Sequence, residues 1–176
     1  MSSTTSPPTP ADASAASHRL KPLRLVAGAS TGGHVNELLI LLQAAAPHWP
    51  VMPDAYVTTM QIGVRSFAAF NRPVHVLGEA DRTKPLQSLA VLWRALATAW
   101  RLRPDVVVTT GSMPLALFSL WARLFGAHIV WIDSVAQVER MSVSGRLAKR
   151  FASLCLVQWP GVAASTPGTE YAGELF

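Results

Sequence analysis

A glycine-rich segment near the start of the chain has the first residues whose types and spacing suggest chemistry. It reads GASTGGH over residues 28–34 and directly follows an apolar run. Small residues let a backbone approach a ligand closely, and the N–H groups that open a helix favour an anion. This glycine loop predicts a phosphate or diphosphate site formed by Ser30, Thr31, Gly32 and Gly33. The alternative is a tight strand-to-helix turn without a ligand.

His34 ends the glycine loop, where a helix is expected to begin. A neutral imidazole there could act as a base or a hydrogen-bond partner, and a capping or packing histidine is the alternative. The loop lacks both the Gly-Lys-Ser/Thr ending of a P-loop and the G-x-G-x-x-G fingerprint. The remaining histidines are isolated and Cys155 lies in an apolar run, so the sequence predicts no metal site, no cofactor and an inert thiol.

Two later segments also place small, polar or ionisable residues after apolar runs. In TTGSMP, residues 109–114, Gly111 and Ser112 offer a second phosphate or hydroxyl contact, or simply an N-cap. In DSVAQVER, residues 133–140, Asp133 is the best acidic candidate for a general base acting on a sugar hydroxyl. An N-cap or a salt bridge would explain Asp133 equally well.

The elements that must position these residues alternate along the chain. Apolar runs predict strands at residues 23–27, 55–58, 74–77, 106–109, 129–132 and 154–157. Helices are predicted at 36–46, 86–102, 114–125 and 144–151. This order predicts an α/β fold with a parallel sheet and helices on both faces. Because ligands bind at the carboxyl ends of such strands, we expect the three loops to converge there.

Composition indicates how many domains the chain forms and what kind of partner it favours. With 176 residues, half of them hydrophobic, the chain fits a Ser/Thr/Pro/Ala-rich disordered tail over residues 1–22 and one domain over 23–176. Only 14% of residues are charged, which leaves apolar surface for a partner or a membrane. The net charge of +5 favours an anionic partner. Nucleic acid is disfavoured, because the basic residues are scattered without a stacking motif.

Two segments bear on membrane contact. Residues 113–132 are largely apolar but read as a helix followed by a buried strand, so no transmembrane segment is predicted. The helix at 86–102 has an apolar stripe, and its tryptophans are accompanied by arginines, as in interfacial membrane helices. We expect the tryptophans to pack onto the sheet, with membrane contact as the alternative. The stripe consists of Leu86, Leu89, Trp93, Leu96 and Trp100.

Four segments together, STGGHVNELL, RPDVVVTTGSMP, IVWIDSVAQVERMSVSGRLAKRFASLCLVQWP and YAGELF, resemble the acceptor-side subunit of bipartite glycosyltransferases. Its eukaryotic form is the membrane-anchored subunit of the enzyme that adds the second GlcNAc to dolichol diphosphate oligosaccharide. Its bacterial forms are PssD- and CpsF-type proteins of capsule and exopolysaccharide assembly. The glycine loop also resembles that of the peptidoglycan GlcNAc transferase MurG. The resemblance implies a single Rossmann-like domain of the GT-B amino-terminal type.

The resemblance also implies partners and a location. A separate carboxyl-half subunit would bind the nucleotide-sugar, and this chain would hold a polyprenyl-diphosphate-linked acceptor. The pair would be an inverting transferase without a metal, cytoplasmic and peripheral at the inner face of the plasma membrane. The roughly 150 residues after the tail suit one such domain and not two, so we expect no activity from the chain alone. A non-catalytic scaffold that recruits the catalytic subunit to the membrane is the alternative.

Site residues are carried over only where the motifs match. Gly32, Gly33 and His34 match the glycine loop, and Gly111 matches the small residue of the second loop. Asp133 and Ser134 fall where relatives have Glu-Ser, whereas Gln137 replaces a common arginine. His34 or Asp133 would then orient or deprotonate the acceptor hydroxyl. The residues expected to hold the diphosphate are Ser30, Thr31, Gly32, Gly33, Gly111, Ser112 and Ser134.

Overall fold

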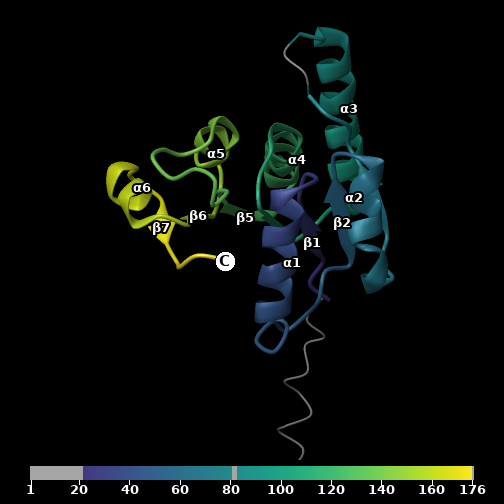
Figure 1. The fold of residues 1–176 in the computed structure, drawn as a ribbon. Helices are drawn as coiled ribbons and strands as arrows, with labels where there is room; N and C mark the ends of the chain where they lie inside the picture. The colour runs from purple at the N-terminus through teal and green to yellow at the C-terminus, as the bar shows by residue number, and fades with distance from the viewer. Residues whose placement is uncertain (1–21, 81–82, 176) are drawn as a thin grey trace, which may run out of the picture.

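The fold is a seven-stranded parallel sheet flanked by helices (Figure 1), seen in a computed structural model that describes residues 22–80 and 83–175. The strand order is β3-β2-β1-β4-β5-β6-β7. The strands are β1 (Leu25–Gly28), β2 (Ala55–Thr58), β3 (Val74–Val76), β4 (Val106–Thr109), β5 (His128–Ile132), β6 (Leu154–Val157) and β7 (Glu170–Tyr171). The helices are α1 (Gly33–Ala45), α2 (Gln61–Ser66), the 3-10 helix η1 (Ala68–Phe70), α3 (Pro85–Leu102), α4 (Met113–Leu124), α5 (Val143–Ala148) and α6 (Pro160–Ser165).

The predicted α/β class is confirmed. Each predicted strand and helix has a counterpart whose ends differ from the prediction by at most three residues. The stretch at 113–132 forms α4 and then β5, as expected. Sequence reading missed α2, η1, α6 and β7, which are two to six residues long. Elements this short hold too few residues to show a helical or strand period. The predicted tail at 1–22 lies outside the described residues except for Pro22.

Two apolar layers fix the sheet between its helices. On one face, small residues of α3 and large residues of α4, such as Ala95 and Phe118, pack on Val107 and Ile129. On the other face, Leu38 and Leu42 of α1 pack with Ala27, Tyr56 and Phe67. All seven strands pair in parallel, so their carboxyl ends lie along one edge. This arrangement holds the loops that follow β1, β4 and β5 at the same edge of the sheet.

The expected packing of the α3 tryptophans onto the sheet is wrong. Trp93 is 69% exposed and Trp100 is 60% exposed, and Leu86 and Leu89 are exposed as well. The buried face of α3 is instead formed by Val91, Ala95 and Ala99. Small side chains at this spacing let α3 approach α4 closely, which leaves the bulky stripe on the outer side. No helix in residues 22–80 and 83–175 is both long and apolar enough to span a bilayer.

A second apolar surface lies on the sheet face that α1 covers only partly. Here Val106, Val130 and Leu154, from β4, β5 and β6, border a groove of about 340 Å³. Trp49, from the segment after α1, lies at its side. Parallel sheets are normally covered on both faces, so this groove leaves apolar sheet surface that the described residues do not cover fully.

Candidate functional site

The candidate site lies where the strand order reverses. β1 pairs with β2 on one side and with β4 on the other, so the chain proceeds outward in opposite directions from this point. A crevice at such a switch point is the usual ligand position in open parallel sheets. The loops after β1 and β4 flank it, and the loop after β5 is next along the edge.

The glycine loop after β1 leads directly into α1. Gly32 is the N-cap residue, with a φ of 79° that favours glycine, and no side chain caps the helix. The first turn of this 13-residue helix has no acidic residue, so its N–H groups and positive dipole end suit an anion. A groove of about 410 Å³ borders Thr31, Gly32 and Asn36 on this side, with α2 as its other wall.

The second loop packs against the first turn of α1. The Thr110 hydroxyl donates a hydrogen bond to the His34 carbonyl oxygen at 2.7 Å. Gly111 has a φ of 115°, and a β-carbon there would lie 3.3 Å from Cε1 of His34 and 3.5 Å from its Nδ1. The sequence-predicted residues His34 and Gly111 are therefore brought into direct contact, and the ring occupies space that only glycine leaves free.

Ser112, which follows Gly111, has an unusual backbone conformation and a buried hydroxyl. Its φ is 100° and its ψ is 156°, a conformation that non-glycine residues rarely adopt. Its hydroxyl oxygen is buried, and no hydrogen-bond partner for it lies among the described residues. Ser112 occupies the N-cap position of α4, but its side chain makes no cap hydrogen bond. Capping of the helix therefore does not explain this hydroxyl.

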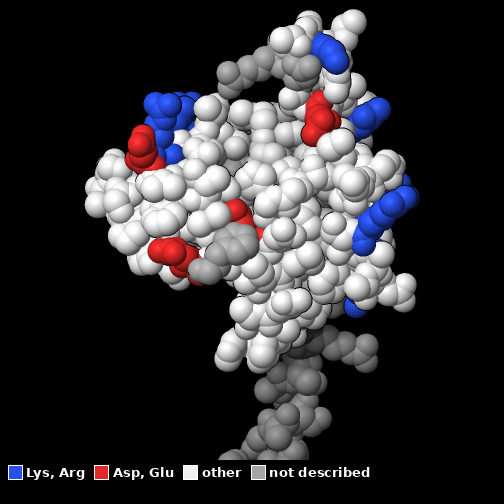
Figure 2. Space-filling model, in the orientation of Figure 1, with Lys and Arg blue, Asp and Glu red and all other residues white. Residues whose placement is uncertain are grey.

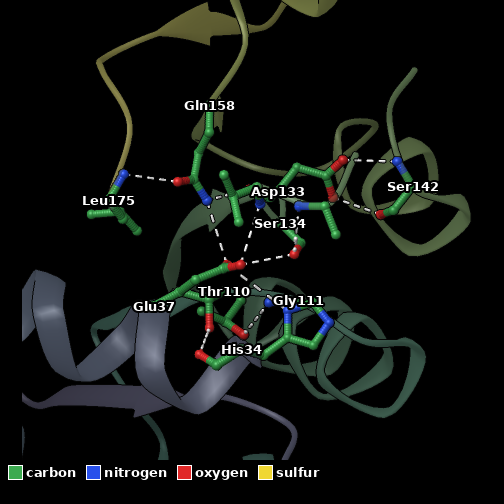
Figure 3. Close-up of polar contacts among 12 residues, drawn as sticks. His34, Glu37, Thr110, Gly111, Asp133, Ser134, Ser142, Gln158 and Leu175 are labelled. Atoms are coloured by element: carbon green, nitrogen blue, oxygen red, sulfur yellow. Dashed lines mark hydrogen bonds and ion pairs between the residues drawn. The ribbon is translucent and has the colours of Figure 1, made fainter. Parts of the chain in front are cut away.

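Glu37, which sequence reading did not single out, is the polar centre of the site (Figure 3). Only 1% of it is exposed. Its Oε1 accepts from the Ser134 hydroxyl at 2.8 Å and the Val135 N–H at 3.2 Å. Its Oε2 accepts from Nε2 of Gln158 at 3.4 Å and lies 4.0 Å from Nδ1 of His34. The available signal was its spacing of three residues from His34, which places both on one helix face.

Gln158 extends this network across the sheet edge. Its Nε2 also donates to the Asp133 carbonyl oxygen at 3.0 Å, and its Oε1 accepts from the Leu175 N–H at 2.9 Å. The carboxyl-terminal segment is thus hydrogen-bonded to the residue that contacts Glu37. Ser134, a predicted ligand contact, is 8% exposed and donates its hydroxyl proton to Glu37.

Asp133 is turned toward the start of α5, away from Glu37 (Figure 3). Its Oδ1 accepts from the Ser142 hydroxyl at 2.6 Å and Nε1 of Trp131 at 3.3 Å, and its Oδ2 accepts from the Ser142 N–H at 2.8 Å. The Ser142 hydroxyl in turn caps α5 by accepting from the Gly145 N–H. These contacts give Asp133 a structural task. Its role as a base stays a prediction.

The other candidate residues are Ser30 and Thr31 of the glycine loop, and Cys155. Ser30 and Thr31 are half-buried in the glycine loop, and the Thr31 hydroxyl lies 3.5 Å from Sδ of Met60. Burial and the nearby Asp133 raise the pKa of the Cys155 thiol to about 12, so this buried thiol stays protonated at neutral pH. Within the described ranges, no three His, Cys, Asp or Glu side chains gather in a way that could hold a metal ion.

Solved structures with the same fold identify the class. MurG from Acinetobacter baumannii aligns with a TM-score of 0.65 and 18% identity, over 86% of this chain and 45% of that protein. UDP-GlcNAc 2-epimerase from Methanocaldococcus jannaschii aligns with a TM-score of 0.56 and 15% identity, over 78% of this chain and 39% of that protein. The protein is thus a Rossmann-like domain that spans less than half the length of these solved chains.

Sequence comparison narrows the class to a family. Residues 65–175 match the family model described as "Oligosaccharide biosynthesis protein Alg14 like", and the chain belongs to this family. The curated relatives include the mouse UDP-N-acetylglucosamine transferase subunit ALG14, 23% identical over 87% of this chain and 83% of the relative. The Yarrowia lipolytica subunit of the same name is 25% identical over 86% of this chain and 81% of the relative.

Proposed function

We propose that this chain is the acceptor-binding and activating subunit of a two-chain inverting glycosyltransferase. Its substrate would be a polyprenyl-diphosphate-linked saccharide in bacterial exopolysaccharide or capsule synthesis, in the manner of PssD- and CpsF-type proteins. One observation carries the proposal: an uncapped helix N-terminus and His34 lie together at the switch point of a single Rossmann-like domain. The naming of relatives as UDP-N-acetylglucosamine transferase subunits supports it.

The arrangement suits acceptor activation. The glycine loop would hold the lipid diphosphate through backbone N–H groups, with Ser30, Thr31, Gly32 and Gly33 around it. Gly111, Ser112 and Ser134 complete the predicted binding set, and the Ser112 hydroxyl has no partner among the described residues. His34 takes the proton of the acceptor hydroxyl while the hydroxyl oxygen bonds to the anomeric carbon of the donor sugar. The bond from that carbon to the nucleoside diphosphate breaks, which inverts the configuration.

His34 suits the role of base better than Asp133. Both carboxylate oxygens of Asp133 already accept hydrogen bonds that hold Ser142 and Trp131. The His34 side chain is 30% exposed, whereas its Nδ1 is buried. The imidazole can therefore offer its other nitrogen to an acceptor in the crevice.

A separate carboxyl-half subunit would supply the nucleotide-sugar. The chain spans 45% of the MurG length, which is consistent with one half of a two-domain catalytic unit. UDP-GlcNAc is the donor to test first, because the curated relatives are named for it. Without that subunit, the crevice beside His34 has no donor and we expect no turnover.

Peripheral attachment to the inner face of the plasma membrane would bring the lipid-linked acceptor to the site. The outer side of α3 exposes Leu86, Leu89 and Trp93, and arginines flank the stripe. Such a mixture suits a lipid interface with acidic headgroups. Figure 2 shows basic side chains near α5 and along the margin formed by α2 and α3, with mostly uncharged surface between them.

Co-expression with a carboxyl-half transferase subunit tests the proposal. Copurification and transfer from UDP-GlcNAc to a polyprenyl-diphosphate acceptor are measured with and without this chain. We expect transfer only from the pair, and a loss of about 100-fold or more for His34→Ala. His48→Ala, an exposed histidine far from the loop in sequence, is the matched control. Normal transfer by an assembled His34→Ala complex would instead support the scaffold alternative.

A further inference from the structure

We propose that Glu37 is a positioning residue that selects the tautomer of His34. It would keep the proton of the neutral imidazole on Nδ1, so that the Nε2 lone pair faces the crevice and receives the acceptor proton. The catalytic part of this inference rests on the proposed function. The tautomer itself is a property of this chain alone and can be measured without a substrate or a partner.

Glu37 is held firmly enough for this task. Three donors, from Ser134, Val135 and Gln158, point at its two oxygens, and they come from the loop after β5 and from the residue that follows β6. The glutamate itself belongs to α1. A buried carboxylate fixed from three sides cannot turn to solvent without leaving these donors unpaired. Its Oε2 therefore stays on the side of the imidazole.

His34 places a buried ring nitrogen near Oε2 of Glu37. Its Nδ1 is buried, has no hydrogen-bond partner among the described residues and lies 4.0 Å from Oε2 of Glu37. A carboxylate oxygen can only accept, so a protonated Nδ1 gains a partner there, while a bare Nδ1 would face lone pairs. Contacts of this kind are often long without substrate and tighten in the complex. Figure 3 shows the second ring nitrogen directed away from Glu37.

Glu37→Gln offers an isosteric test because one orientation of its amide keeps more of the native hydrogen bonds. Oε1 accepts from the Ser134 hydroxyl and the Val135 N–H, whereas Oε2 accepts only the longer contact of 3.4 Å from Gln158, so the amide oxygen takes the Oε1 position and the Gln158 contact is lost. The new NH₂ group then faces His34. It donates to Nδ1, which favours the tautomer with the proton on Nε2 and removes the lone pair from the crevice.

The experiment is a long-range ¹H–¹⁵N correlation spectrum of the imidazoles in the ¹⁵N-labelled full chain. It is recorded in mildly alkaline buffer, where ordinary histidines are neutral, and His34→Asn assigns the signal. We expect the Nδ1–H tautomer in the native chain, the Nε2–H tautomer in Glu37→Gln and no change in Glu139→Gln, an exposed glutamate used as the control. An Nε2–H tautomer in the native chain, or the same tautomer in Glu37→Gln as in the native chain, would overturn the inference.

A kinetic arm separates this inference from the proposed function. In the two-chain transfer assay, Glu37→Gln should lower kcat by about 100-fold with KM within about twofold, because binding is kept and the base is lost. Unchanged kcat in Glu37→Gln, with His34→Ala inactive, would overturn the positioning role. Failure of the proposed function looks different: His34→Ala would remain active, while the tautomer spectra would still decide whether Glu37 controls the ring.

Discussion

At the residue scale, Ser112 combines backbone strain with a buried hydroxyl that lacks a described partner. Non-glycine residues in this conformation cost on the order of 1–3 kcal/mol, and such residues cluster at functional sites. A serine at this position is therefore hard to explain by folding. The strain and the buried hydroxyl without a described partner make Ser112 a candidate for a functional role.

Ser112→Gly should separate these two effects. Glycine adopts the backbone conformation without strain, so we expect the free energy of unfolding to rise by about 1 kcal/mol. Transfer by the two-chain enzyme should fall, because the hydroxyl is lost. Urea denaturation of the chain and the transfer assay measure the two quantities. A variant that is less stable and fully active would show that the hydroxyl supports the fold instead.

Asp133→Asn should destabilise the loop that leads to α5. An amide has one accepting oxygen, whereas the Ser142 N–H and hydroxyl now donate to two different carboxylate oxygens. One partly buried donor would lose its partner, at a cost of about 1 kcal/mol in the free energy of unfolding. Urea denaturation measures the change. Glu139→Asn, an exposed acid in the same loop, should change it by less than about 0.5 kcal/mol.

Tyr56 makes the fold sensitive to alkali. It stacks on Phe67 with ring centroids 4.6 Å apart, and burial raises the pKa of its hydroxyl to about 12. Between about pH 10 and 12 the unfolded chain would lose this proton while the folded chain keeps it, so stability falls as the pH rises through that range. Cys155, whose thiol pKa is also raised to about 12, acts in the same direction.

Thermal unfolding at pH 8 and pH 11 tests this sensitivity. Tyr56→Phe should reduce the drop in Tm between the two values, because its ring packs alike but does not titrate. An equal drop in Tyr56→Phe and in the native chain would contradict a role for Tyr56.

The sequence correctly placed His34 at the start of a helix, because the glycine loop alone contains that signal. The parallel order of the strands predicted that the loops of His34 and Gly111 converge, and the structure brings these two residues together, whereas their roles stay predictions. Glu37 was missed because a glutamate in a helix usually faces solvent. Its donors lie about 100 residues away or more, at Ser134 and Gln158, and local spacing holds no information about them.

At the element scale, α3 forms the helix that the sequence predicts, but the predicted orientation of its apolar stripe is wrong. The pattern correctly predicted a helix, but the more hydrophobic stripe was assigned to the core. Amphipathic pattern alone does not say which face meets the sheet when the opposite face has small residues. Here Ala95 and Ala99 allow closer packing than Trp93 and Trp100 would, so the large side chains remain outside.

The exposed stripe of α3 predicts binding to acidic lipid vesicles. We expect the combined substitution Leu89→Ala and Trp93→Ala to weaken vesicle binding of the chain several-fold, because buried apolar area drives insertion at the interface. Ile62→Ala, an equally exposed apolar residue on α2, should change it little. Cosedimentation with vesicles containing about 30% anionic lipid, compared with neutral vesicles and with added salt, measures binding. Equal binding by both variants would contradict a membrane role for α3.

At the scale of the whole molecule, the sequence predicted the parallel sheet but not its coverage. Alternating strands and helices define βαβ units, and their handedness gives the faces. The groove beside Val106, Val130 and Leu154 could not be predicted from the sequence, because it depends on how far the described residues cover three separate strands.

The buried state of Cys155 has a practical consequence for spectroscopy. It is the only cysteine in the chain, and its thiol is both shielded by apolar neighbours such as Val157 and Ala148 and kept protonated at neutral pH. Maleimide dyes react with accessible thiolates, so the native chain should remain unlabelled. A cysteine placed at position 93 or 124 would then accept a single fluorophore. Its emission would report whether that part of the surface contacts a bilayer, without any background mutation.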